Sequence, residues 1–322
     1  MTEKSRLFSR PTRKEFLRGA ASAALLPLFP RISVAETYEA EVSEVAPGVF
    51  VHVAPYELVE PTNHGDISNS CIIVGNDAVA VVDTGGSYLV GKALRAAAAK
   101  VTSKPIRYVI NTHMHPDHVL GNAAFEGNGT EFVGHAKLPA ALSARAESYL
   151  RTAQTRLGET GFAGTKIVIP TKLVSDTLDL DLGGRSLTLK ARATSHTDND
   201  LTVFDSTTGT FVLGDLLFSG HIPTLDGSIV GWLKLIPELM NEKAQRAIPG
   251  HGPKSMQWPD AMLPQQRYLE TIARDVRTLI KDGATLEQAL KTAGQSERDN
   301  WQLFAELNGM NVTAAFTELE WE

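Results

Sequence analysis

The sequence predicts a layered α/β fold, because short apolar runs typical of strands alternate with longer segments of helical composition. Two apolar runs within residues 71–83 flank the turn-forming residues Gly75-Asn76-Asp77, which predicts a hairpin. Helical composition follows at residues 88–101, and residues 106–110 are predicted to form another strand. Strands that run into helices in this way, twice along the chain, indicate stacked layers of sheet and helix.

The remaining predicted elements continue this alternation. Residues 136–160 have helical composition, and residues 259–281 form an amphipathic helix whose apolar face is expected to pack on the core. Further strands are predicted at residues 45–53, 167–190 (around a Gly183-Gly184 turn), 201–205 and 210–214. No repeat or low-complexity tract interrupts the pattern, so one large domain is favoured.

Composition narrows the classes of function. The chain has 322 residues, of which 43% are hydrophobic and 21% charged, as in ordinary globular proteins. Residues 1–35 hold 7 Lys and Arg but 2 Asp and Glu, which leaves 24 basic and 35 acidic residues elsewhere, a net charge of −11. Nucleic acid is therefore not expected as a partner. The sole cysteine, Cys71, excludes an internal disulfide and any multi-cysteine metal site.

Residues 1–35 have the pattern of a signal peptide. A basic segment at residues 12–18 precedes an apolar run at residues 19–29, and small residues at the spacing of a cleavage site follow. The stretch resembles a twin-arginine signal, except that Lys14 stands in place of the second arginine. The apolar run is too short to cross a bilayer, so no membrane span is expected in the mature protein. We expect a periplasmic protein that begins near Glu36.

Four metal-binding side chains lie within six residues, directly after the strand predicted at residues 106–110. His113 and His115 project to the same side of an extended segment, so they can share one ion. Pro116 is predicted to begin a helix, which turns Asp117 and His118 towards a second ion. Imidazole and carboxylate are zinc-type ligands. A polar loop of solvated histidines is the alternative, and it accounts poorly for such a dense cluster.

A catalytic zinc needs more than two histidine ligands, and the sequence offers three further candidates. His196, Asp215 and His251 each follow an apolar run that is predicted to be a strand. Open α/β folds build their sites at such strand ends. We therefore expect these three residues to join the cluster.

These residues, with Asp83-Thr84-Gly85, resemble the full motif set of the metallo-β-lactamase superfamily over roughly residues 45–260. The resemblance implies an αββα sandwich with the site on one edge, in which Asp83 supports the metal loop. It also implies two ions, bridged by Asp215. The implied ligands are His113, His115 and His196 for the first ion, and Asp117, His118 and His251 for the second.

Two further segments, residues 221–233 and 311–322, are similar to exported zinc metallohydrolases associated with quinoprotein relay systems. This resemblance implies a periplasmic quinoprotein dehydrogenase as a partner. We accordingly expect a signal peptide at residues 1–35, a metallo-β-lactamase-fold domain at 36–260, and a helical extension at 261–322 packed on the same domain.

The expected function is that of a dizinc hydrolase that acts on an ester, lactone, thioester or amide bond of a small molecule. Two cations share a bridging hydroxide that attacks the substrate, with Asp117 as a proton shuttle beside Asp215. Iron or manganese are alternative ions. His64, His221 and Trp232 are candidate substrate contacts, although packing is the commoner role for such residues.

Three alternatives stay open. A β-lactam substrate is less favoured, because typical zinc β-lactamases lack an aspartate at the position of Asp215. An iron-dependent redox enzyme similar to persulfide dioxygenases shares this fold, but retention of all seven ligands argues against it. The third alternative is a non-catalytic metal-binding partner of a periplasmic quinoprotein.

Overall fold

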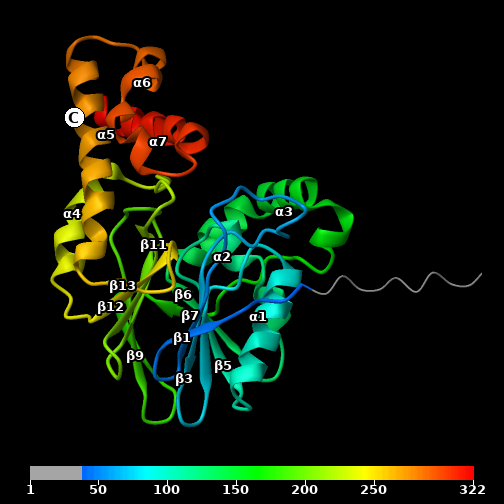
Figure 1. The fold of residues 1–322 in the computed structure, drawn as a ribbon. Coiled ribbons are helices and arrows are strands. Elements are labelled where there is room, and N and C mark those ends of the chain that lie inside the picture. The colour runs from blue at the N-terminus through cyan, green and yellow to red at the C-terminus, as the bar shows by residue number, and fades with distance from the viewer. Residues whose placement is uncertain (1–37) are drawn as a thin grey trace, which may run out of the picture. The chain divides into compact units, whose positions relative to one another are not determined.

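Two β-sheets stacked face to face form the centre of the protein in the computed structural model, which describes residues 38–322 (Figure 1). The predicted signal peptide lies outside the described residues. Residues 38–322 form one compact unit. Helices cover the outer face of each sheet, so the predicted αββα sandwich is confirmed.

The first sheet, sheet A, contains seven strands in the order β1 to β7. Neighbouring strands are antiparallel from β1 to β4 and parallel from β4 to β7. The strands are β1 (Ser43–Ala46), β2 (Val49–His52), β3 (Ser70–Val74), β4 (Val79–Val82), β5 (Ile106–Ile110), β6 (Glu131–His135) and β7 (Lys172–Val174).

The second sheet, sheet B, contains six strands in the order β13-β12-β11-β10-β9-β8. Only β11 and β12 are parallel neighbours among its described strands. The strands are β8 (Thr177–Asp181), β9 (Ser186–Ala191), β10 (Leu201–Asp205), β11 (Thr210–Phe218), β12 (Arg246–His251) and β13 (Met256–Gln257).

The helices divide between the two outer faces. On the side of sheet A lie α1 (Tyr88–Val101), α2 (Pro116–Val119), α3 (Leu138–Phe162) and the 3-10 turn η1 (Asn122–Phe125). On the side of sheet B lie α4 (Ile229–Met240), α5 (Leu263–Lys281), α6 (Leu286–Thr292), α7 (Phe304–Leu319) and the 3-10 turns η2 (Asp260–Met262) and η3 (Gln295–Asn300). No helix of the described residues is long and apolar enough to cross a membrane.

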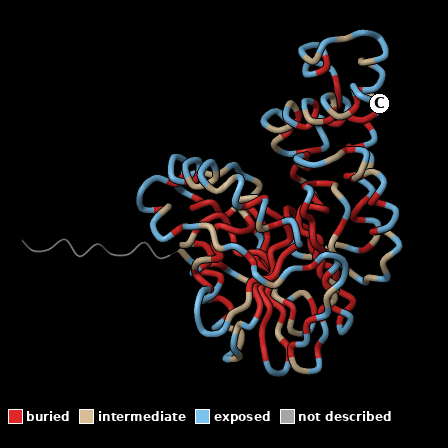
Figure 2. The backbone as a smooth tube through the Cα atoms, turned by 180° about the vertical axis from the view of Figure 1, so that it is seen from behind, coloured by how far each residue is buried: buried red, intermediate tan, exposed pale blue. Residues whose placement is uncertain are grey.

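The main core lies between the sheets, where apolar side chains such as Ile73 of sheet A and Leu189 and Val203 of sheet B pack together. Buried segments are accordingly concentrated in the middle of the sandwich (Figure 2). A second core joins sheet B to α4, α5 and α7 and includes Trp232 and Tyr268. Removal of this apolar surface from water is the main stabilisation of the layered arrangement.

Local sequence explains α1. The Ser87 hydroxyl accepts a hydrogen bond from the backbone N–H of Val90 and caps the first turn. Val90, Leu94 and Ala97 recur at helical spacing and face the core. The observed helix coincides with the predicted residues 88–101.

One predicted boundary is wrong in an informative way. The strand predicted at residues 210–214 continues to Phe218 as β11. Gly214 interrupts the pairing with β12 and has a φ of +52°, which a glycine adopts without steric cost. The irregularity places Asp215 inside the strand rather than after it.

A buried ion pair joins the two sheets through the β8–β9 turn. The Arg185 guanidinium donates to both carboxylate oxygens of Asp205, at 3.2 and 2.6 Å, and to the carbonyl oxygens of Pro47 and Val74. Burial alone would raise the pKa of Asp205, but hydrogen bonds from Arg185 and Thr208 outweigh burial and lower it. The pair therefore stabilises the fold above the unfolded-state pKa of about 4, and this stabilisation is lost as pH falls through the folded-state pKa.

Replacing Arg185 should be costly because Asp205 would stay buried without its partner. We expect Arg185→Met to lower the free energy of unfolding by about 3 kcal/mol. The exposed pair Arg151–Glu147 provides the control, since Arg151→Met should change stability by less than about 0.5 kcal/mol. Urea denaturation of both variants near neutral pH measures the difference. Equal stabilities for the two variants would contradict the role of Arg185.

Candidate metal centre

The candidate ligands come together at one edge of the sandwich, although they are spread over 139 positions of sequence, from His113 to His251. Sheet A supplies the segment that follows β5, and α2 begins at Pro116 as predicted. Sheet B supplies Asp215 within β11 and His251 at the end of β12. His196 lies in the loop between β9 and β10.

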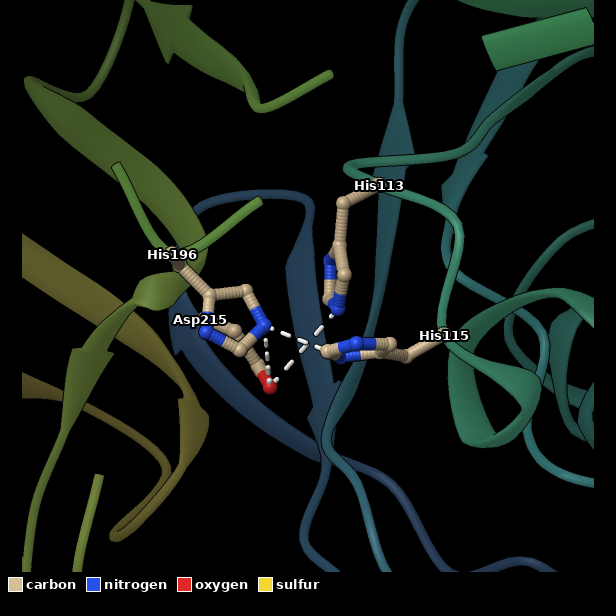
Figure 3. Close-up of side chains that lie close together, drawn as sticks. All are labelled: His113, His115, His196 and Asp215. Atoms are coloured by element: carbon tan, nitrogen blue, oxygen red, sulfur yellow. Dashed lines mark hydrogen bonds and ion pairs between the residues drawn. The ribbon is translucent and has the colours of Figure 1, made fainter. Parts of the chain in front are cut away.

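One group of four side chains is drawn in Figure 3: His113, His115, His196 and Asp215. The Nε2 atom of His196 lies 3.0 Å from Nδ1 of His115 and 3.4 Å from Oδ2 of Asp215. The Nε2 atom of His113 lies 3.7 Å from the same carboxylate oxygen. Four ligand-type atoms therefore face a common point.

The hydrogen bonds outside this group fix which ring nitrogens carry protons. His196 donates from Nδ1 to the carbonyl oxygen of Thr224 at 2.7 Å, and His115 donates from Nε2 to Asp226 at 3.1 Å. If both rings are neutral, each has one proton, and the nitrogens that face each other at 3.0 Å then both present lone pairs. A cation between them would turn this repulsion into attraction.

The second group consists of Asp117, His118 and His251. The Nε2 atoms of His118 and His251 each lie 3.3 Å from Oδ2 of Asp117. Both rings also contact Asp215, His118 at Oδ1 (3.1 Å) and His251 at Oδ2 (3.4 Å). Asp215 therefore touches both groups.

Close backbone approach makes this position of Asp215 attainable. A Cβ atom on Gly250 would lie 1.9 Å from Oδ1 of Asp215, well inside van der Waals contact. A Cβ atom on Gly214 would lie 2.6 Å from Cβ of Thr112. Residues with side chains at these two glycine positions would displace the aspartate or the loop that follows β5.

Asp83 supports the cluster from behind, as the resemblance implied. Its carboxylate accepts hydrogen bonds from the Thr112 backbone N–H (2.8 Å), the Thr112 hydroxyl (2.7 Å) and Nδ1 of His118 (2.9 Å). The Thr112 hydroxyl in turn accepts from Nδ1 of His113 at 2.9 Å. One buried carboxylate thus orients a histidine of each group.

Asp226, which orients His115, was not predicted from the sequence. The segment that carries it is held by α7: Asn311 donates to the Pro223 carbonyl and accepts from the Leu225 N–H, and Glu318 accepts from the Ile229 N–H. Asp226 lies within residues 221–233, the stretch for which the sequence suggested a similarity to quinoprotein-associated hydrolases. That similarity was the one signal that could have pointed to it.

Electrostatics separate the two groups. Burial lowers the pKa of His196 to about 3 and that of His113 well below its usual value, so both rings are neutral, the form that binds metals. Burial would also lower the pKa of His251, but Asp215 and Asp117 outweigh burial and raise it to about 9. Without a metal, protonated His118 and His251 therefore balance the carboxylates of Asp117 and Asp215.

Buried polar atoms that lack a hydrogen bond show whether the cluster suits a metal ion. Nε2 of His113, Nε2 of His118 and Oδ1 of Asp215 are buried and lack a hydrogen bond of satisfactory geometry. Buried polar atoms of this kind are rare in native proteins unless an ion or a water satisfies them. Other such atoms occur elsewhere in the described residues, but these three face one another within the candidate ligand set, so the residues present fit a pair of metal ions.

A cavity of about 390 Å³ opens onto the cluster, and His115, Asp117, Asp215 and His251 form its floor. Of the three candidate substrate contacts, His221 lines this cavity, where it stacks on His251 at a ring-centroid distance of 4.8 Å. His64 and Trp232 are not among the lining residues.

The structure gives His64 and Trp232 other surroundings. Trp232 is fully buried and packs edge-on against His196, with ring centroids 5.5 Å apart. His64 is buried and contacts the ring of Tyr38. Neither position offers the side chain to a substrate in this cavity, so their prediction as substrate contacts is corrected to packing roles.

The fold and the cluster agree with the comparison to known families. The chain belongs to the metallo-beta-lactamase superfamily, whose sequence model matches residues 64–276. This fold is typically that of a metal-dependent hydrolase. No curated relative matches the chain in sequence.

Solved structures share the fold at low sequence identity. The stereoselective inverting sec-alkylsulfatase Pisa1 from Pseudomonas sp. has a TM-score of 0.67 and 15% identity over 86% of this chain. This chain spans about half of the alkylsulfatase, 50% of its length. Metallo-beta-lactamases from Pontibacter korlensis and Hirschia baltica have TM-scores of 0.56 and 0.55 at 18% and 21% identity. Those matches cover 71% and 72% of this chain and 99% and 98% of theirs.

The role of Asp83 can be tested through metal affinity. Asp83 has a φ of +60°, which asparagine tolerates, so Asp83→Asn should fold. The loss of a charged acceptor for His118 and Thr112 should weaken metal binding by about tenfold or more. Competition against a chelating dye measures this change. Asp260→Asn, at an exposed aspartate outside the cluster, should bind metal as the wild type does, and an equal affinity for Asp83→Asn would contradict the supporting role.

Proposed function

We propose that the protein is an exported dizinc hydrolase that cleaves an ester, lactone, thioester or amide bond of a small molecule. One observation carries the proposal: seven ligand-type side chains converge in two groups that share Asp215, and four of them, His115, Asp117, Asp215 and His251, line a cavity. Histidine and carboxylate ligands without cysteine suit zinc, with iron or manganese as alternatives. Two such ions, held by these residues, would supply Lewis-acid chemistry that activates a nucleophile at neutral pH and stabilises negative charge on the reacting oxygen.

The chain's own residues would then position the two ions and neutralise their charge. Asp215, in contact with both groups, would set the spacing between the ions. The pKa of Asp117 is lowered well below its usual value because His118 and His251 outweigh the effect of burial. Asp117 is therefore ionised at neutral pH and borders the cavity as a carboxylate.

His221 has a separate role in this proposal. Its Nδ1 donates to the Ile222 carbonyl oxygen at 2.6 Å, which leaves Nε2 as an acceptor. Burial lowers the pKa of His221 to about 4, so the ring is neutral at physiological pH. A neutral imidazole in the cavity wall would accept a hydrogen bond from the substrate.

The similarity of residues 221–233 and 311–322 to quinoprotein-associated hydrolases supports a location beside a periplasmic quinoprotein dehydrogenase. It supports a context and not a substrate. A non-catalytic metal-binding partner of such a dehydrogenase is the rival proposal, and the turnover experiments below distinguish the two.

Asp215→Asn should abolish turnover, because the amide cannot compensate two cations as the carboxylate does. The assay is a panel of activated esters, lactones, thioesters, amides, β-lactams, phosphodiesters and a secondary alkyl sulfate, the last because of the structural likeness to an alkylsulfatase. We expect at least a thousandfold loss with the circular dichroism spectrum retained. Asp179→Asn, at an exposed site on β8, is the control.

Metal analysis accompanies this assay. The wild type should hold close to two zinc ions per chain. One iron ion per chain would contradict the hydrolase proposal in favour of the redox alternative. Unchanged turnover in Asp215→Asn would contradict the site assignment. Two zinc ions without turnover on any substrate class would favour the non-catalytic partner.

Export is tested independently. Residues 1–40 fused to a reporter protein should carry the reporter to the bacterial periplasm, because they contain the basic and apolar segments of a signal peptide. Replacement of both Arg13 and Lys14 by glutamine should block this transport. Cell fractionation provides the measurement, and a reporter that stays in the cytoplasm would remove the proposed location.

A further inference from the structure

The cavity wall contains one charged side chain that the structure leaves unpaired. Besides the candidate ligands, three charged residues line the cavity: Glu57, Asp226 and Arg156. Glu57 accepts a hydrogen bond from Asn63 at 3.1 Å, and Asp226 contacts His115 at 3.1 Å. Arg156, on the exposed side of α3, forms neither a hydrogen bond nor an ion pair with any of residues 38–322.

The positive charge of Arg156 contrasts with the charge of the protein. The protein as a whole is negatively charged, with a formal net charge of −6, so its long-range field does not attract anions. The other arginine of α3 near the cavity, Arg145, lies 3.9 Å from Asp226. Arg156 is therefore the positive charge that remains available to a molecule in the cavity.

Another part of the cavity wall is apolar. Leu58, from the segment before β3, is 41% exposed, and Met310 of α7 is 64% exposed, and both line the cavity. Leu307, one turn before Met310, is partly buried against the core of α4, α5 and α7 and also lines it. Apolar side chains from two distant segments thus border one opening.

Both apolar walls are anchored. Val59, beside Leu58, packs against Ala153 and Leu157 of α3, the helix that carries Arg156. The α7 helix is fixed to the rest of the site through Asn311, which also lines the cavity. Exposed apolar groups on fixed elements around a cavity are typical of a binding surface rather than of a loose end.

We infer that the substrate is an anionic amphiphile: its negative group binds Arg156 and its hydrocarbon chain lies against Leu58, Leu307 and Met310. This inference rests on the proposed function, because it places the scissile bond at the metal cluster. Arginine suits this role, since its planar guanidinium binds carboxylate, sulfate or sulfonate oxygens through paired hydrogen bonds. The flexible thioether of Met310 suits a chain of variable shape.

Binding of a molecule that cannot be hydrolysed tests the inference without any need for turnover. Octane-1-sulfonate has a carbon–sulfur bond in place of an ester, and calorimetry with the metal-loaded protein gives its affinity. Arg156→Gln should weaken binding about tenfold, the amount expected for loss of a charged hydrogen bond. Arg151→Gln, on the same helix but outside the cavity wall, should bind as the wild type does.

The apolar wall is tested by chain length. Octane-1-sulfonate should bind the wild type at least tenfold more tightly than butane-1-sulfonate, since each buried methylene adds to affinity. Met310→Gln should reduce this ratio about threefold. Trp321→Gln, at an 84% exposed apolar residue that does not line the cavity, should leave the ratio unchanged. Both sites are exposed enough for the variants to fold.

Two results would overturn the inference. The first is an affinity for octane-1-sulfonate that Arg156→Gln leaves unaltered, and the second is an alkyl sulfonate affinity that does not depend on chain length.

A third measurement links binding to turnover. In Arg156→Gln, the ratio of kcat/KM for the nitrophenyl monoester of hexanedioate to that of nitrophenyl hexanoate should fall about tenfold. If the wild type hydrolyses neither these esters nor any other substrate class of the panel, the proposed function fails, while the sulfonate affinities still decide the inference.

Discussion

The contact between Asp215 and both histidine groups is the interaction on which the rest of the structure depends. Three buried or half-buried carboxylates, Asp83, Asp117 and Asp215, meet five imidazole rings at one edge of the sandwich. Isolated charges at such depth would be strongly destabilising, so these carboxylates and rings must lie close enough to compensate one another. The glycines at 214 and 250 and the bulge in β11 are consequences of this requirement.

Much of the site could be predicted from the sequence because its ligands are chemically distinctive and follow strands. His113 to His118 form a dense local pattern, and the order of His196, Asp215 and His251 completes it. Asp226 carries no such signal: it contacts His115 across 111 positions of sequence, and an exposed Asp-Gly pair is otherwise an ordinary turn. Only the tertiary structure brings the two residues together.

The predictions that the structure corrects concern features that depend on tertiary structure. An apolar run does not show where a strand bends, so it predicts an end at residue 214, whereas β11 continues past the bulge to Phe218. His64 and Trp232 lie close in sequence to site elements, but proximity in sequence does not determine which way a side chain faces. Trp232 follows the helical periodicity of α4 into the core beneath His196. Arg156 was passed over because a single arginine on a polar helix face is unremarkable until a cavity is found beside it.

The hydrogen bonds from α7 to residues 223–229 show that the candidate metal centre depends on the C-terminal helix. The family match ends at residue 276, and all seven candidate ligands precede that point. A chain cut there would keep every ligand yet lose Asn311 and Glu318, and with them the contacts that fix the backbone around Asp226. The hydrogen bond from the Asp226 N–H to the His196 carbonyl oxygen would remain, but the residues on both sides of Asp226 would lose their attachment to α7. The last helix therefore supports the candidate metal centre, although it carries none of the ligands.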